Sequence, residues 1–232
     1  MVIDGTWFKK KENCALVYWD PVLKRVQWWR YTTGERTFEV AEDLRKLKKA
    51  GFVCSSATGD GATGIIGGVR VEYPDIPYQR CVTHVQRDAR GFVTQNPKTE
   101  AGKELSPLIP RLSEINTYEE KDCWVENFES WCNRWEDFLK EKTCPDGDKH
   151  WWYTHKQLRR ARSLIRGAIT NLFHYLDDPS IPKTSNGLEG RFSSFKQHYK
   201  QHRGLSKKRR EGYIAWYLTV VVNGDLPTHG GY

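Results

Sequence analysis

Three runs rich in aromatic and β-branched residues occupy the first 33 positions and constrain the fold of this chain more than any other feature. They cover residues 1–7, 15–19 and 25–31, and the pair Asp20-Pro21 separates the second run from the third. Aromatic and β-branched side chains favour strands, whereas Asp and Pro favour turns. The pattern therefore predicts an antiparallel meander of three strands.

After this meander, helix and strand signals alternate. Apolar residues recur at helical spacing at Phe38, Ala41, Leu44 and Leu47. This spacing predicts a helix that begins at Thr37 and stops before Gly51. A buried strand is expected at residues 52–54, a helix at 63–73 and a strand at 78–83. This order predicts an α/β (α+β) fold with a mixed five-stranded sheet flanked by helices.

From residue 84 onward the pattern is helical almost throughout. Helical spacing covers residues 85–94, 100–115, 118–141, 154–176, 186–200 and 206–222. We therefore expect residues 1–84 to form the first part of a sheet domain. Residues 85–183 should form a large all-helical insertion, and residues 184–232 should supply the helices that complete the sheet domain.

The composition of the chain limits the classes of partner that it could bind but does not identify a single one. The chain has 232 residues, with 37 Lys and Arg against 29 Asp and Glu, which gives a net charge of +8. This balance fits a polyanionic partner, although many basic proteins bind no nucleic acid. The six cysteines form no C-x-x-C pair, so we expect reduced thiols in a cytoplasmic protein. No apolar run approaches the length of a membrane span, so no membrane is expected as a partner.

Asp4 is the first candidate site residue, because it follows directly on an apolar run. Burying a carboxylate costs several kcal/mol unless a charge or a metal ion compensates it. We therefore expect Asp4 to lie at the end of the first strand and to face a ligand. Asp60 and Glu189 are the two distant carboxylates expected to converge with it, so that the three bind divalent metal ions.

Asp60 lies in a glycine-rich segment that allows two other interpretations. Residues 59–64 fit the G-x-G-x-x-G pattern and lie between a predicted strand and a predicted helix. The acidic residue that a dinucleotide site needs about twenty positions later is absent, and no βαβ unit precedes the motif. A nucleotide site is therefore disfavoured, whereas capping of the next helix by Asp60 stays an open alternative.

Glu189 lies near the start of a predicted amphipathic helix. Leu188, Phe192, Phe195 and Tyr199 share one stripe and should face the core. Glu189 heads the neighbouring, basic stripe, and we expect the cations of this helix to contact DNA: Arg191, Lys196, Lys200 and Arg203. An ion pair, or a capping box with Asn186, is the alternative to metal binding by Glu189.

Two further groups of residues suggest contacts with nucleic acid. The last helix opens with four cations, Lys207, Lys208, Arg209 and Arg210, where the helix dipole disfavours positive charge. A phosphate there would relieve this cost, and a solvated helix end is the alternative. Trp151 and Trp152 precede several basic residues, a mixture that can stack bases and hold the backbone, although a core role is the alternative.

Cys81 and His84 have half the spacing of a zinc site. The second half is missing, so a packed thiol beside a hydrogen-bonded imidazole is favoured over metal ligation.

Four short motifs in a specific order resemble the Mutator-like group of DDE transposases found in bacterial insertion sequences. They are Asp4-Gly-Thr-Trp7, Gly59-Asp-Gly61, Cys81-x-x-His84 and Asn186-x-Leu-Glu-Gly190. The resemblance runs over essentially the whole chain. It implies an RNase H-like fold, with Asp4, Asp60 and Glu189 as the metal-binding triad and Cys81 and His84 as structural or DNA-proximal support. It also implies that the site binds two Mg²⁺ (or Mn²⁺) ions. The implied partner is DNA, which includes both the transposon ends and the target.

The activity implied by the resemblance is DNA strand cleavage followed by joining of the freed 3′ end to a target. A homodimer or larger oligomer on DNA and association with the bacterial nucleoid are implied as well. Family members carry a DNA-binding region ahead of the first aspartate, so we expect a chain truncated at its N-terminus. The alternatives are a catalytically inactive or domesticated DNA-binding protein, and an RNase H-like nuclease without strand transfer.

Overall fold

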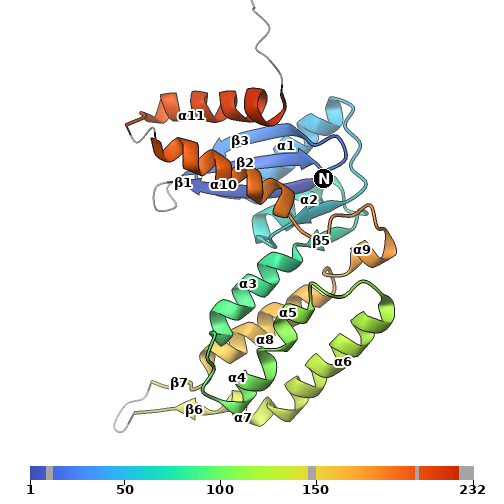
Figure 1. Cartoon of the computed structure of the whole chain (residues 1–232), viewed down its shortest axis with the longest axis vertical. Helices are drawn as coiled ribbons and strands as arrows, with labels where there is room; N and C mark the ends of the chain where they lie inside the picture. Colours follow the sequence, from blue (N-terminus) through green and yellow to red (C-terminus); the bar gives the residue numbers. More distant parts are fainter. Residues whose placement is uncertain (9–12, 146–149, 202–203, 225–232) are drawn as a thin grey trace, which may run out of the picture. The chain divides into compact units, whose positions relative to one another are not determined.

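A computed structural model describes residues 1–8, 13–145, 150–201 and 204–224. The chain forms two compact units, of which the first joins Met1–Gln79 to Ser180–Tyr232 and the second is Arg80–Pro179 (Figure 1). The sequence predicted boundaries after residues 84 and 183, and the observed division falls after residues 79 and 179.

The first unit is built on a five-stranded mixed sheet with the order β3-β2-β1-β4-β5. Its strands are β1 (Val2–Phe8), β2 (Asn13–Asp20), β3 (Arg25–Thr32), β4 (Ala57–Gly59) and β5 (Tyr78–Arg80). Strands β1, β2 and β3 pair antiparallel, whereas β4 pairs parallel to β1. The predicted meander and the mixed five-stranded sheet are therefore confirmed.

Helices cover both faces of this sheet, because neighbouring strand residues point to opposite sides. On one face, Val2, Phe8 and Val17 pack against α10 (Asn186–Gln201), α11 (Lys207–Trp216) and η2 (Tyr217–Val222). On the other face, Ile3, Leu16 and Tyr18 pack against α1 (Thr37–Lys49) and α2 (Thr63–Glu72). The first and last segments of the chain thus share one core (Figure 1).

Helix α1 forms where the sequence predicted it, and Ala41, Leu44 and Leu47 are buried as predicted, but one predicted core residue is not. Phe38 was expected in the core and is 65% exposed, whereas Val40 and Asp43 are fully buried. The carboxylate of Asp43 accepts hydrogen bonds from Arg30 Nε at 2.8 Å and from the Tyr18 hydroxyl at 3.1 Å. These polar contacts join the Asp43 side of α1 to the sheet, and Phe38 lies away from that side.

The strand predicted at residues 52–54 is wrong. Val53 is 87% exposed, and the strand forms at Ala57–Gly59 instead. There the N–H of Thr58 donates to the carbonyl of Met1 at 2.8 Å. Gly59 is required in this strand because a Cβ there would overlap the Tyr78 hydroxyl. The strand β4 therefore consists of small residues, so no run of large apolar residues marks it in the sequence.

The second unit is mainly helical. Its elements are α3 (Val82–Val93), α4 (Glu100–Leu105), α5 (Leu108–Arg111), α6 (Tyr118–Arg134), α7 (Glu136–Lys140), β6 (Lys142–Thr143), β7 (Trp152–Tyr153), α8 (Lys156–Ile169) and α9 (His174–Asp177). The two-residue strands β6 and β7 pair as a hairpin that the sequence did not predict. A capping box between Thr117 and Glu120 starts α6, and Trp124, Phe128 and Trp131 are buried on one side of this helix. Over the described ranges, no helix combines the length and apolar character needed to cross a membrane.

Candidate functional site

Asp4 lies in the middle of β1 and not, as predicted, at the end of the strand. Strand β1 continues to Phe8, because Gly5 pairs with Leu16 and Phe8 pairs with Asn13 of β2. The neighbour on the other side is much shorter, since β4 ends at Gly59. Asp4 is 5% exposed, so its carboxylate is buried beside the point where the parallel neighbour of β1 stops.

The register of β1 and β4 brings Asp60 next to Asp4. Val2 is the partner of Thr58 in the parallel ladder, and each aspartate follows two residues later in its own segment. Residues two apart point to the same face, and neighbouring strands are about 4.8 Å apart. Accordingly, a carboxylate oxygen of Asp4 and one of Asp60 lie within 4.8 Å of each other.

The turn after β4 explains the glycine-rich motif without a nucleotide. Gly61 has a φ of 93°, a left-handed conformation that glycine adopts without strain. Gly64 lies in close contact with the backbone of Glu35, where a Cβ would overlap the carbonyl. The glycines are therefore needed for the turn and for close packing of α2.

Helix capping accounts for only part of the Asp60 environment. The N-cap residue of α2 is Ala62, which makes no side-chain cap, and Asp60 Oδ1 accepts the N–H of Ala62 at 2.8 Å. Asp4 Oδ1 likewise accepts the N–H of Gly5 at 2.8 Å. Two carboxylates this close repel each other when ionised, and a hard divalent cation with oxygen ligands would relieve the repulsion.

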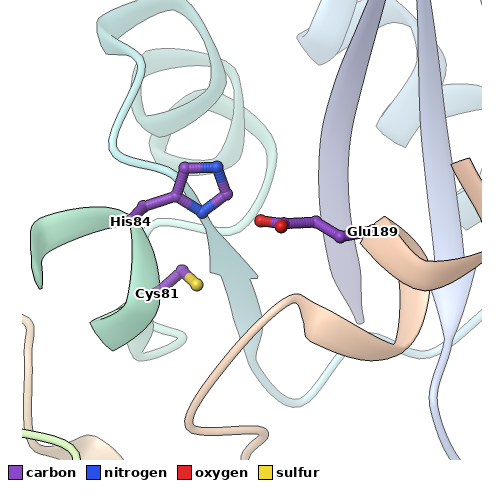
Figure 2. Close-up of side chains that lie close together, drawn as sticks. All are labelled: Cys81, His84 and Glu189. Carbon is purple, nitrogen blue, oxygen red and sulfur yellow. The ribbon is translucent and has the colours of Figure 1, made fainter. Parts of the chain in front are cut away.

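Glu189 belongs to the same unit, and its side chain extends from the beginning of α10 (Figure 2). The segment that leads into α10 lies beside β4, since the Thr58 hydroxyl donates to the carbonyl of Pro182 at 3.0 Å. Helix α10 covers the face of the sheet to which Asp4 also points. Ser185 donates its hydroxyl to Glu189 Oε1 at 3.4 Å, and Asn186 lies within the helix, so the proposed capping box is not formed.

The three predicted metal ligands do not form one tight cluster. Among the described residues, the close group contains Asp4 and Asp60, and the carboxylate of Glu189 is not within 4.8 Å of both. The structure thus brings together two members of the triad and places the third on the helix that covers the same face of the sheet.

Glu35 is a carboxylate near this site that the sequence did not reveal. A Cβ at Gly5 would overlap the Glu35 carboxylate, so this side chain lies against β1 directly after Asp4. Burial raises the pKa of the Cys14 thiol, and the negative charges of Glu35, Asp4 and Asp60 raise it further, while Lys196 acts in the opposite direction. No pattern marked Glu35, because it lies in the connection between β3 and α1 and follows no apolar run.

The raised pKa of Cys14 predicts a loss of stability at alkaline pH. The folded protein keeps this thiol neutral above its ordinary pKa of 9.0, whereas the unfolded chain ionises it. This contribution is therefore fully present below pH 9 and is lost as the pH rises towards the folded pKa. Between pH 8 and pH 10 it should cost about 1.4 kcal/mol of unfolding free energy.

Urea unfolding at the two pH values checks this expectation. Cys14→Ala should lose about 1.4 kcal/mol less than the parent protein over this pH range. The matched control is Cys123→Ala, which removes an exposed thiol and should leave the pH dependence unchanged. Equal pH dependence in all three proteins would contradict the prediction.

Cys81 and His84 belong to the second unit and lie at the start of α3 (Figure 2). Cys81 is the N-cap residue and is fully buried, and His84 is 9% exposed. The thiol sulfur and a ring nitrogen of His84 lie within 4.8 Å of each other. The pair is therefore close enough to share a ligand or to support the start of α3, and both interpretations from the sequence stay predictions.

The predicted DNA-contacting cations of α10 and α11 differ in exposure. Lys196, Lys200, Lys208 and Arg209 are exposed. The guanidinium of Arg191 lies over the Trp19 ring, 4.4 Å from its centroid, and so also binds this helix to the sheet. Arg203 and the side chain of Lys207 lie outside the described residues.

Arg210 does not fit the predicted role in DNA contact. It is 3% exposed, and its Nη1 donates to the Tyr31 hydroxyl at 3.2 Å. One turn into α11, the side chain faces the sheet rather than solvent, on the side where Ile214 of α11 and Tyr217 of η2 pack against the sheet. The N-cap of α11 is Ser206, whose hydroxyl accepts the N–H of Arg209 at 3.4 Å.

Trp151 and Trp152 lie at the β6–β7 hairpin of the second unit and are 50% and 49% exposed. The alternative of a core role is therefore wrong for both. Contact with DNA stays a prediction for this pair.

No family model and no curated protein matches this sequence.

Proposed function

We propose that this chain is the catalytic domain of a DDE-type transposase, which cleaves DNA strands with the help of metal ions and joins the freed 3′ ends to a target. The observation that carries the proposal is the pair of carboxylates from Asp4 and Asp60, aligned by the parallel register of β1 and β4. The strand order β3-β2-β1-β4-β5, with helices on both faces, supports an RNase H-like fold as the finer assignment.

The residues at this site fit divalent metal ions. The donor set is made of carboxylate oxygens, which Mg²⁺ and Mn²⁺ prefer, and one carboxylate is buried while the other is partly exposed. Asp4 and Asp60 would hold the metal, and Glu189 would complete the ligand set from α10. When bound, two such ions supply Lewis-acid stabilisation of an in-line phosphoryl displacement. The exposed lysines of α10 would hold the DNA backbone beside the site.

A strand-transfer assay tests this proposal. The protein is incubated with labelled DNA carrying a free 3′ end and a supercoiled target plasmid, with Mg²⁺, with Mn²⁺ or with a chelator. The expected result is cleaved or joined product that appears only with metal. Failure to form either product with any DNA end tested, in a protein that still binds DNA, would overturn the proposal.

The position of Glu189 favours a second candidate, a DNA-binding protein derived from a transposase that no longer cleaves DNA. Its carboxylate does not join the Asp4–Asp60 pair, so the metal ligand set is incomplete in this conformation. Calorimetric titration with Mn²⁺ separates the two candidates. Loss of binding heat in Glu189→Gln supports the enzyme, whereas unchanged binding in that variant supports the inactive protein.

A further inference from the structure

Helix α8 of the second unit carries its cations in two sets, and the first set is neutralised by glutamates. Arg162 pairs with Glu136 of α7. Arg166 Nη2 lies 2.7 Å from Glu129 Oε2 of α6. These pairs bind α8 to its neighbouring helices, and their role is internal to the unit.

The second set, Lys156, Arg159 and Arg160, has no carboxylate partner among the residues that the structure describes. Arg159 is nevertheless held in place, because its guanidinium stacks on the Tyr153 ring at 3.5 Å and Nη1 donates to the carbonyl of Leu139 at 2.9 Å. Three cations without counter-charge within one turn of helix repel one another. An anionic ligand would remove this cost.

These cations line a pocket with aromatic walls. The pocket has a volume of about 410 Å³, and Phe92 and Tyr153 line it together with the three cations. It shares Phe92 and Lys156 with a second pocket of about 380 Å³, which runs along residues 92–99 and 154–158. Among the described residues, no acidic residue lines either pocket. A continuous basic track with aromatic rings suits a chain of linked phosphates and bases better than a single anion.

The exposed Trp151, which directly precedes β7, extends this surface. The rings of Trp151 and Tyr153 contact edge to face, with centroids 5.4 Å apart. Lys142 Nζ lies 3.8 Å from the centroid of the Trp151 ring. Cations and aromatic rings therefore alternate from the hairpin into the pocket.

We propose that this track, which we call the α8 track and which Phe92, Tyr153, Lys156, Arg159 and Arg160 define, binds a single-stranded segment of DNA. A pocket of this size accepts one nucleotide and excludes a duplex. The aromatic rings would stack on bases that a duplex hides, and the cations would contact phosphates. The inference rests on the proposed function for the choice of DNA, and it does not involve the carboxylates of the first unit.

Fluorescence anisotropy with the full chain tests the α8 track, with a labelled single-stranded oligonucleotide and the corresponding duplex as probes. The double variant Lys156→Ala/Arg160→Ala should weaken single-strand binding by about tenfold or more. Its salt dependence should fall by about 1.4 in log–log slope, because two phosphate contacts are lost. Phe92→Leu keeps an apolar side chain but removes the stacking ring, and should weaken single-strand binding by about fivefold or more.

The matched control is Arg134→Ala/Lys140→Ala, which removes the same charge from the same unit at cations already paired with glutamates. This control should change affinity by less than about twofold. Equal loss in the control and the track variant, or equal loss of duplex and single-strand binding in Phe92→Leu, would overturn the inference. Binding is measured with a chelator present, so failure of the proposed metal-dependent catalysis and failure of the α8 track give different results.

Discussion

Replacing Asp60 with asparagine should reduce metal-dependent cleavage and joining of DNA by about a hundredfold to a thousandfold or more. The amide keeps the size of the side chain and can still accept the N–H of Ala62, so the turn after β4 should survive. The substitution removes the negative charge of Asp60, whose carboxylate lies within 4.8 Å of that of Asp4. A divalent metal ion binds to such a pair of carboxylates through their charged oxygens. Losing one charged group at the reacting centre typically has an effect of this size.

The rate of strand transfer at saturating Mg²⁺ gives the first measurement, and the thermal shift on adding Mn²⁺ gives the second. Binding of an ion at about a hundred times its dissociation constant should stabilise the parent protein by about 2.7 kcal/mol, and this gain should vanish in Asp60→Asn. The control is Asp75→Asn, an exposed aspartate of the same unit. A parent-like rate together with a parent-like metal shift in Asp60→Asn would exclude this carboxylate as a ligand.

Replacing Arg30 with methionine should destabilise the first unit by about 3–5 kcal/mol. Arg30 donates from Nε and Nη2 to both carboxylate oxygens of Asp43, at 2.8 Å and 2.6 Å. The Asp43 side chain is completely buried, so without Arg30 its charge would keep, among the described residues, only the hydrogen bond from the Tyr18 hydroxyl. An unpaired buried carboxylate is far more costly than the ion pair is favourable.

Urea unfolding of two matched variants isolates this effect. Arg45→Met breaks an ion pair between α1 and Glu72 in which the arginine side chain is 54% exposed, and should cost no more than about 1 kcal/mol. In Arg30→Met the additional change Asp43→Asn should restore part of the lost stability, because the buried charge is removed. If Arg30→Met unfolds at the same urea concentration as Arg45→Met, the Arg30–Asp43 ion pair does not hold α1 on the sheet.

The sequence predicted the elements whose apolar pattern is regular. Strands β1, β2 and β3, helices α2 and α10 and the core stripe of α10 follow from side-chain spacing alone. The prediction failed where long-range polar contacts decide the outcome. Phe38 has the right spacing for the core, yet it is exposed, whereas the polar Asp43 is buried on the other side of α1 and pairs with Arg30.

The candidate site was predictable in its residues but not in its geometry. The sequence predicted Asp4 and Asp60 as site residues because each carboxylate follows a strand signal. That their carboxylate oxygens lie within 4.8 Å of each other depends on the pairing register of β1 and β4, which the sequence alone does not give. Glu35 could not be predicted, because its position against Gly5 is a tertiary contact without a local sequence pattern. The burial of Arg210 could not be predicted for the same reason. In a helix where charged and apolar residues alternate irregularly, the sequence does not show which arginine faces the core.

The first unit is assembled from two segments that the second unit separates in the chain. During synthesis, β1 to β3 leave the ribosome early, while their partners α10, α11 and η2 are made only after the whole second unit. At usual translation rates this delay is on the order of ten seconds or more. During that time the apolar side chains of Val2, Val17 and Trp19 are exposed to solvent, because the helices that bury them have not yet been made. We therefore expect a chaperone that covers this face of the sheet during synthesis to raise the yield of folded protein, and an abrupt rise in the rate of synthesis to favour aggregation.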